Sequence, residues 1–116
     1  MKRNLEFRIG NSAIRPNSKF QIPNSGVRLS LTLHGAVQGV GFRWFARQQA
    51  QLLGCTGYVR NDPRGGRVEV VAEGSRDVLE ELMRRLRQGP PGAQVTHVEA
   101  EWQESTGEFG HFQIRR

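Results

Sequence analysis

The sequence predicts an α+β fold in which two helices cover one face of an antiparallel sheet. In several short segments apolar residues alternate with polar ones, which is typical of strands with one buried face. In two longer segments apolar residues recur every three or four positions, which is typical of amphipathic helices. The segments follow the order strand, helix, strand, strand, helix, strand, with a short extra strand at the end. A chain of 116 residues has room for one core, so one domain is expected.

The first half of this pattern is the clearest. From Val27 to His34, apolar side chains occupy every second position, which predicts a strand. A glycine-rich stretch, residues 35–41, follows it. Apolar residues then recur at helical spacing from Phe42 to Leu53, and Gly54 stands where a helix would end, so this segment is predicted to be a helix whose apolar stripe lies on the sheet.

The second half adds a hairpin, a helix and two strands. The segments Thr56–Asn61 and Arg67–Glu73 flank a turn rich in proline and glycine, which predicts a β-hairpin. Ser75 is a candidate N-cap for the second helix. The last strands are expected at Val95–Trp102 and His111–Ile114. This order favours a ferredoxin-like split βαβ sandwich, an architecture that hosts enzymes, metal carriers and RNA binders alike.

Residues 1–26 differ from the rest of the chain. They hold five basic residues against one acidic residue, and Pro16 and Pro23 would interrupt a long helix. We interpret residues 1–26 as a flexible basic N-terminal leader and residues 27–116 as the folded domain. A transit peptide and an over-extended start are the alternatives for the leader.

The charge distribution argues against a nucleic-acid-binding face on the domain. The formal net charge is +6, but residues 27–116 carry twelve arginines and ten acidic residues, so most of the excess lies on the leader. No apolar run approaches the roughly 20 residues needed to cross a bilayer. The single Cys55 excludes an internal disulfide. We expect a cytoplasmic monomer with no membrane or nucleic-acid partner.

The three histidines give no sequence signal for a metal. His34, His97 and His111 lie far apart along the chain, on predicted strands, and are interpreted as exposed or hydrogen-bonded strand residues rather than ligands. No cluster of acidic residues indicates magnesium. The sequence therefore predicts neither a metal site nor a cofactor.

The glycine-rich stretch is the first feature that indicates chemistry. Glycines between a strand and a helix allow successive N–H groups to converge on one point, and the helix N-terminus adds unpaired N–H groups and a partial positive charge. Arg43, in the first helical turn, would add a planar fork of donors. The stretch is therefore a candidate site for an anion such as phosphate. Phe42 and Phe45 are expected in the core, and Trp44 as a pocket flank or a surface aromatic.

Two motifs together resemble the signatures of the acylphosphatase family. The first is Gly35-x-Val37-Gln38-Gly39-Val40-x-Phe42-Arg43; the second is Gly57-Tyr58-Val59-Arg60-Asn61, followed by a glycine turn, Val68 and Gly74. The resemblance covers about residues 27–116. It departs from the family pattern in two places: Ala36 stands where a basic residue is frequent, and the turn after Asn61 is one residue longer.

The resemblance implies an enzyme that hydrolyses the carboxyl-phosphate bond of acyl phosphates by in-line attack of water, without metal or cofactor. It implies that Arg43 is the essential cation and that Asn61 positions the water. The phosphate cradle that it implies consists of Val37, Gln38, Gly39, Val40, Gly41, Phe42 and Arg43. Inorganic phosphate or sulfate would compete with the substrate. Because neither motif contains a histidine or an acidic residue, a substrate phosphate oxygen is the expected proton acceptor.

Two alternatives follow from the same residues. A non-catalytic phosphate- or RNA-binding module of this fold would keep the pocket without turnover. An acylphosphatase-like domain adapted to carbamoyl phosphate would serve a larger maturation system.

Overall fold

The protein, represented by a computed structural model, is described over residues 26–116, so the expected leader lies outside the described residues except for Gly26. All seven predicted elements are present, and most of their bounds agree with the sequence prediction to within two residues. In chain order the elements are β1 (Val27–Ala36), α1 (Phe42–Leu52), β2 (Thr56–Asn61), β3 (Arg67–Gly74), α2 (Arg76–Gln88), β4 (Gln94–Glu104) and β5 (Phe112–Arg115).

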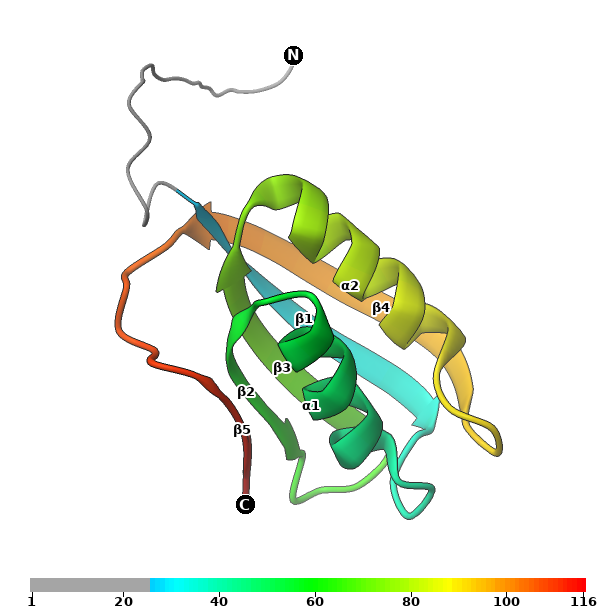
Figure 1. Ribbon diagram of the computed structural model, residues 1–116. Coiled ribbons are helices and arrows are strands. Elements are labelled where there is room, and N and C mark those ends of the chain that lie inside the picture. The colour runs from blue at the N-terminus through cyan, green and yellow to red at the C-terminus, as the bar shows by residue number, and fades with distance from the viewer. Residues whose placement is uncertain (1–25) are drawn as a thin grey trace.

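The strands form one five-stranded sheet in the order β4-β1-β3-β2-β5, with both helices on the same face (Figure 1). This confirms the ferredoxin-like α+β architecture. One detail differs from an all-antiparallel sheet: β5 pairs with β2 in parallel, so the sheet is mixed. The reason is the connection after β4, which runs along one end of the sheet and delivers β5 to the far edge (Figure 1). None of the described helices has the length and apolar character needed to cross a bilayer.

The core lies between the sheet and the helices. On β1, Leu29, Leu31 and Leu33 are buried while the residues between them are not, as the alternating pattern predicts. The helices contribute one apolar stripe each. Their buried residues are Phe42, Ala46 and Ala50 on α1 and Leu79, Leu82 and Leu86 on α2. The opposite face of the sheet carries no helix (Figure 1).

A buried carboxylate holds the connection that brings β5 across. Glu73, only 6% exposed, accepts hydrogen bonds from Arg28 Nε at 2.8 Å and from the backbone N–H groups of Thr106 and Gly107 at 2.9 and 3.0 Å. Burial by itself would raise the pKa of Glu73, but the Thr106 amide and Arg28 stabilise the carboxylate and lower the pKa overall. The charge therefore anchors residues 105–111 to the sheet, which fixes the path of the chain toward β5.

Candidate active site

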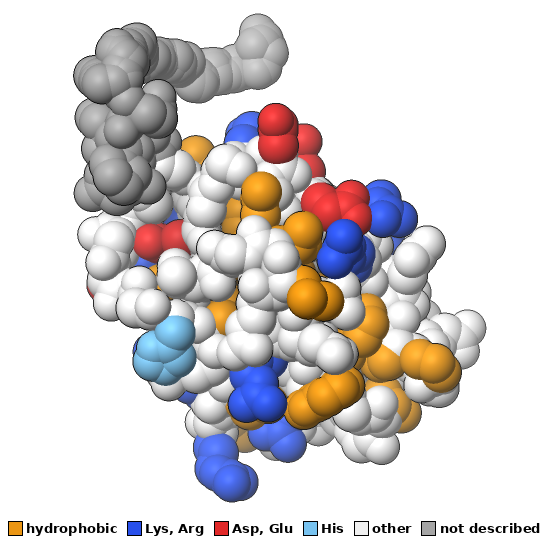
Figure 2. Space-filling view, viewed as in Figure 1, with side chains coloured by type: hydrophobic (Ala, Val, Ile, Leu, Met, Phe, Trp, Pro, Cys, Tyr) orange, Lys and Arg blue, Asp and Glu red, His pale blue; other side chains and the backbone are white. Residues whose placement is uncertain are grey.

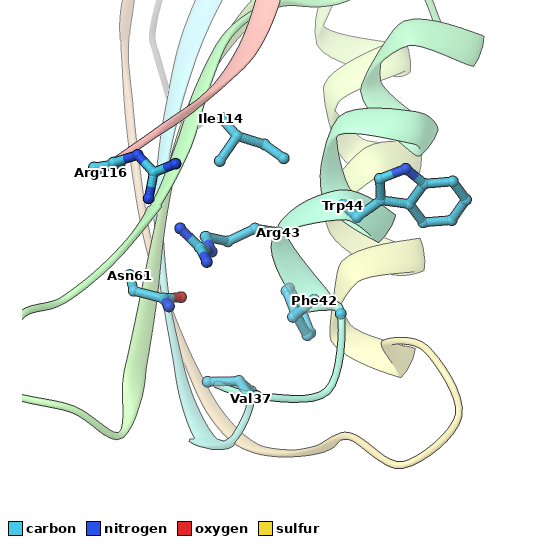
Figure 3. Close-up of a pocket in the computed structure, with 9 residues that line it drawn as sticks. Val37, Phe42, Arg43, Trp44, Asn61, Ile114 and Arg116 are labelled. Carbon is cyan, nitrogen blue, oxygen red and sulfur yellow. The ribbon is translucent and has the colours of Figure 1, made fainter.

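A pocket of about 380 Å³ opens where α1 begins and where β2 and β5 end. Its volume lies within the range of roughly 300–1,000 Å³ that is typical of small-molecule sites. Figure 3 shows its lining side chains. They are Val37, Gly39, Gly41, Phe42, Arg43, Trp44, Asn61, Ile114 and Arg116.

The N-terminus of α1 faces this pocket without a side-chain cap. Gly41 is the N-cap residue, with φ 76° and ψ 20°, and no side chain accepts a hydrogen bond from the first turn. Gly39 also has a positive φ of 80°. A Cβ at either glycine would meet no atom within 4 Å, so glycine is needed for the backbone angle and not for space. The first turn also lacks an acidic residue, which leaves its N–H groups and the helix dipole available to an anion.

Arg43 extends from the first turn of α1 into the pocket. Figure 3 shows its guanidinium directed toward the side chain of Asn61. Among the residues that the structure describes, Arg43 forms no ion pair, whereas the nearby Arg60 and Arg64 each bind an acidic side chain. A half-buried cation without a protein counter-ion is suited to bind an anionic ligand.

Asn61 faces Arg43 from the end of β2. In β2 the residues Gly57 and Val59 are buried under the helices, and Asn61, two positions further, projects to the same side. Its carboxamide points toward the guanidinium of Arg43 (Figure 3). The two side chains that the sequence singles out thus lie on one side of the sheet and meet in one pocket.

Two residues of the predicted phosphate loop do not line the pocket. The Nε2 of Gln38 donates hydrogen bonds to the carbonyl oxygens of Asp62 at 3.0 Å and Arg67 at 2.8 Å. Gln38 therefore ties the loop to the β2–β3 turn beside Asn61. Val40 is partly buried and packs against the core. The side chain of Gln38 therefore braces the loop and that of Val40 anchors it to the core, while binding of phosphate by the backbone amides of residues 37–43 stays a prediction.

Asp62, which follows the pocket residue Asn61 in the sequence, forms its hydrogen bonds within the β2–β3 turn. The Asp62 carboxylate, in a residue 3% exposed, accepts hydrogen bonds from the backbone N–H and the Nη2 of Arg64 at 2.8 and 2.9 Å. Arg67 lies 3.3 Å away. These contacts, those of Arg64 above all, lower the pKa of Asp62 to about 2. Asp62 does not line the pocket.

The sequence prediction did not include Ile114 and Arg116. The parallel register of β2 and β5 pairs Val59 with Ile114 and Arg60 with Arg115, which brings Arg116 to the level of Asn61. No sequence pattern reveals this, because alternation indicates which face a residue takes and not which strand lies beside it. Trp44 meets both of its expected descriptions, since it is 55% exposed and lines the pocket.

The charged side chains that line the pocket, among the described residues, are both basic. Arg43 and Arg116 line it, and none of its nine described lining residues is Asp, Glu, His or Cys. Figure 2 shows basic side chains gathered at the end of the helical face where α1 begins, with the acidic side chains of that view lying elsewhere. An uncapped helix N-terminus beside two guanidinium groups is chemically suited to bind an anion.

Comparison with known proteins gives the family. The acylphosphatase family model matches residues 29–114, so the chain belongs to the acylphosphatase family. An acylphosphatase of Caldivirga maquilingensis is 48% identical over 91 residues, which cover 78% of this chain and 96% of that protein.

Solved structures agree with this family. The crystal structure of an acylphosphatase from Bacillus subtilis is 31% identical, with a TM-score of 0.74, over 78% of this chain and 99% of that one. An acylphosphatase structure from Coxiella burnetii is 38% identical, with a TM-score of 0.71, over 77% and 92% of the two chains.

Proposed function

We propose that this pocket is the active site of an acylphosphatase, in which Arg43 and the loop amides bind the phosphoryl group and Asn61 positions the attacking water. As a member of the family the chain is a hydrolase of acyl phosphates. The observation that carries the assignment of roles is the convergence of Arg43 and Asn61, from α1 and β2, at an uncapped helix N-terminus.

The residue types suit the demands of this reaction. The leaving group is a carboxylate, whose acid has a pKa near 4, so its departure needs no general acid. The barrier instead reflects charge on the transferring phosphoryl group, whose transition state is loose, and the alignment of water with the breaking bond. Preorganised N–H groups and Arg43 meet the first demand, and Asn61 meets the second.

The proton released by the attacking water needs an acceptor, and the side chains that line the pocket offer none among the described residues. A carboxamide accepts and donates hydrogen bonds but takes no proton near neutral pH. No acidic or histidine side chain lines the pocket in the described part of the chain, and Asp62 is bound by Arg64. We therefore assign the proton to a phosphate oxygen of the substrate. The water oxygen bonds to phosphorus, the bond to the acyl oxygen breaks, and the carboxylate leaves with the electron pair.

Arg116, which follows β5, adds a second cation to the pocket that Arg43 enters from α1. Its guanidinium faces Arg43 and Asn61 (Figure 3), and among the described residues it forms no ion pair. Two guanidinium groups at one pocket repel each other unless an anion lies between them. We assign Arg116 to the outer oxygens of the bound phosphate.

The acyl part of the substrate would meet apolar surface. Ile114, Phe42 and Trp44 line the same pocket as the two arginines. An aromatic or aliphatic acyl group would bury apolar area against these side chains, whereas inorganic phosphate would not. Inorganic phosphate and sulfate are accordingly proposed as competitors for the anion site alone. We also propose that the active unit is a monomer and that it acts in the cytoplasm.

The experiment that tests this proposal is hydrolysis of benzoyl phosphate in the presence of a strong metal chelator. We expect turnover that the chelator does not reduce and that inorganic phosphate inhibits competitively. Binding of inorganic phosphate without hydrolysis would favour the non-catalytic module instead. Salt-sensitive binding of RNA in place of phosphate would favour the RNA-binding alternative.

A further inference from the structure

Three potential metal ligands meet on the face of the sheet that the helices leave open. His34 lies on β1 and His97 lies directly opposite it on β4. Glu99, two residues beyond His97 on β4, projects to the same face. We propose that His34, His97 and Glu99 form a binding site for a divalent transition-metal ion such as Zn²⁺, on the opposite side of the sheet from the pocket.

The distances between the donor atoms fit a shared ion. Glu99 Oε2 lies 3.5 Å from His34 Nε2 and 3.7 Å from His97 Nε2, and the three donor atoms lie within 4.8 Å of one another. Ligands bound tetrahedrally to Zn²⁺ at roughly 2.0–2.1 Å stand about 3.3 Å apart. Small side-chain rotations would therefore bring the three atoms onto one ion. Two imidazoles and one carboxylate make a donor set that zinc uses in sites with an open fourth position.

One of these donor atoms is otherwise left unsatisfied. His34 Nε2 is buried and has no hydrogen-bond partner, which distinguishes it from every other side-chain nitrogen and oxygen that is buried in the described residues. A buried polar atom without a partner costs free energy. A metal ion held between His34, His97 and Glu99 would supply that partner.

The surrounding strand geometry supports the convergence. The register of β1 and β4 shifts directly after the His34–His97 pair, leaving Thr96 as the extra residue. Such bulges bend a strand and re-aim its side chains. On the other side of β1, the neighbour of His34 is Arg67, whose guanidinium is paired with Asp62 at 3.3 Å. The nearest cation on β3 is therefore already neutralised.

The proposed ion would stabilise the folded protein and would take no part in the hydrolysis. It would clamp β1 to β4 one residue before Gly35, where β1 leads into the phosphate loop. A ligand that binds only the folded state raises the melting temperature. This inference is independent of the proposed catalytic roles, and it departs from the sequence-based expectation that the histidines serve only as separate strand residues.

The test is titration of the untagged, full-length chain with Zn²⁺ near neutral pH, followed by calorimetry and thermal unfolding. We expect one ion per chain and a higher Tm with zinc. Loss of an outer-shell partner of a metal site already weakens binding by about 10–100-fold, so His97→Ala and Glu99→Gln should each weaken it at least tenfold. His97 and Glu99 are exposed, so both variants should fold.

The matched control is His111→Ala, which removes the third histidine of the chain. His111 lies beside Gln113, before β5 and outside the cluster. This variant should bind zinc as the native chain does. Absence of zinc binding, native affinity in His97→Ala, or an equal loss in His111→Ala would overturn the site.

Discussion

The two helices begin in opposite ways, at opposite ends of the sheet (Figure 1). At the start of α2, Ser75 accepts a hydrogen bond from the N–H of Val78 at 3.3 Å, and Asp77 lies in the first turn. At the start of α1, Gly41 provides no side chain and the first turn has no acid. Both helices carry unpaired N–H groups and a partial positive charge at this point. In α2 the N–H of Val78 is capped and Asp77 offsets the charge, whereas in α1 neither a cap nor an acidic residue competes with a ligand.

The same contrast extends to the side chains around each end. Near the start of α2 the buried Glu73 is paired with Arg28 and two backbone amides. Near the start of α1, Arg43 and Arg116 line the pocket, and none of the described residues that line it with them is acidic. The difference shows that the candidate site lies at the helix N-terminus that lacks a cap and an acidic partner, and not at the one that has both.

Removing Arg43 should have the largest effect. Loss of one preorganised donor typically costs about 10²–10³ in kcat, and Arg43 supplies a charged fork, so Arg43→Ala should lower kcat/KM for benzoyl phosphate by at least about a thousandfold. Arg47→Ala is the matched control, one helical turn further along α1 and outside the pocket. It should keep near-native kinetics. Native affinity for inorganic phosphate in Arg43→Ala would contradict the role of this residue.

Removing Asn61 should affect turnover more than binding. Asn61→Ala is expected to lower kcat about a hundredfold while the inhibition constant for inorganic phosphate changes little, because the carboxamide acts on the water and not on the phosphate. Steady-state kinetics with phosphate as inhibitor measure both quantities. A parallel loss in kcat and in phosphate affinity would instead make Asn61 a phosphate ligand.

Placing an acidic side chain at the N-terminus of α1, as at the start of α2, should weaken phosphate binding by charge repulsion. A carboxylate at position 41 would lie near the phosphate; at roughly 8 Å and an effective dielectric constant of about 20 the repulsion is about 2 kcal/mol per unit charge. Gly41→Asp should therefore bind phosphate at least about thirtyfold more weakly than Gly41→Asn. Asparagine has the same shape and also tolerates a positive φ, so the pair isolates the charge. Equal affinities would show that the helix N-terminus does not contact the anion.

Removing the cap of α2 should change stability alone. Ser75→Ala is expected to lower the free energy of unfolding by about 1 kcal/mol, which corresponds to a Tm decrease of roughly 4–8 °C in a domain of this size. Calorimetry and steady-state kinetics measure the two effects on the same sample. A change in kcat or KM would mean that the two helix ends are coupled.

The smallest effect concerns acid stability at the pocket end. Asp62 has a pKa of about 2 in the folded protein against 3.8 as the ordinary value, so its stabilising contribution is complete above about pH 4 and is lost as the pH falls toward 2. Asp62→Asn should flatten the fall in unfolding free energy over this range, measured by urea denaturation. The comparison variant is Glu81→Gln on α2, because Arg84 and Arg85 lower the pKa of the Glu81 carboxyl to about 2 as well. An unchanged slope in Asp62→Asn would contradict the Arg64 contacts.

The sequence was sufficient for the elements because most have one buried face, and β4 packs the partly buried Val95, Val98 and Trp102 against the core. The alternation from Val27 to His34 and the helical spacing from Phe42 onward both reflect burial against one core. The parallel pairing of β5 was not predictable, since it depends on the path of residues 105–111 and on contacts with Glu73 that no local pattern encodes.

The site was predictable only in part, for a related reason. The two motifs indicated Arg43 and Asn61, and the structure brings them together. Arg116 enters the pocket through the β2–β5 register, and the Gln38 side chain binds the backbone carbonyls of Asp62 and Arg67 and does not line the pocket. Both outcomes depend on partners distant in sequence.

The most direct test of the central claim is a titration of the protein with inorganic phosphate, followed through the backbone amide resonances in ¹H–¹⁵N spectra. The account predicts that the largest shifts fall on the amides of residues 39–43, while the amides at the start of α2 do not move. Phosphate-induced shifts centred elsewhere, or equal shifts at both helix ends, would contradict it.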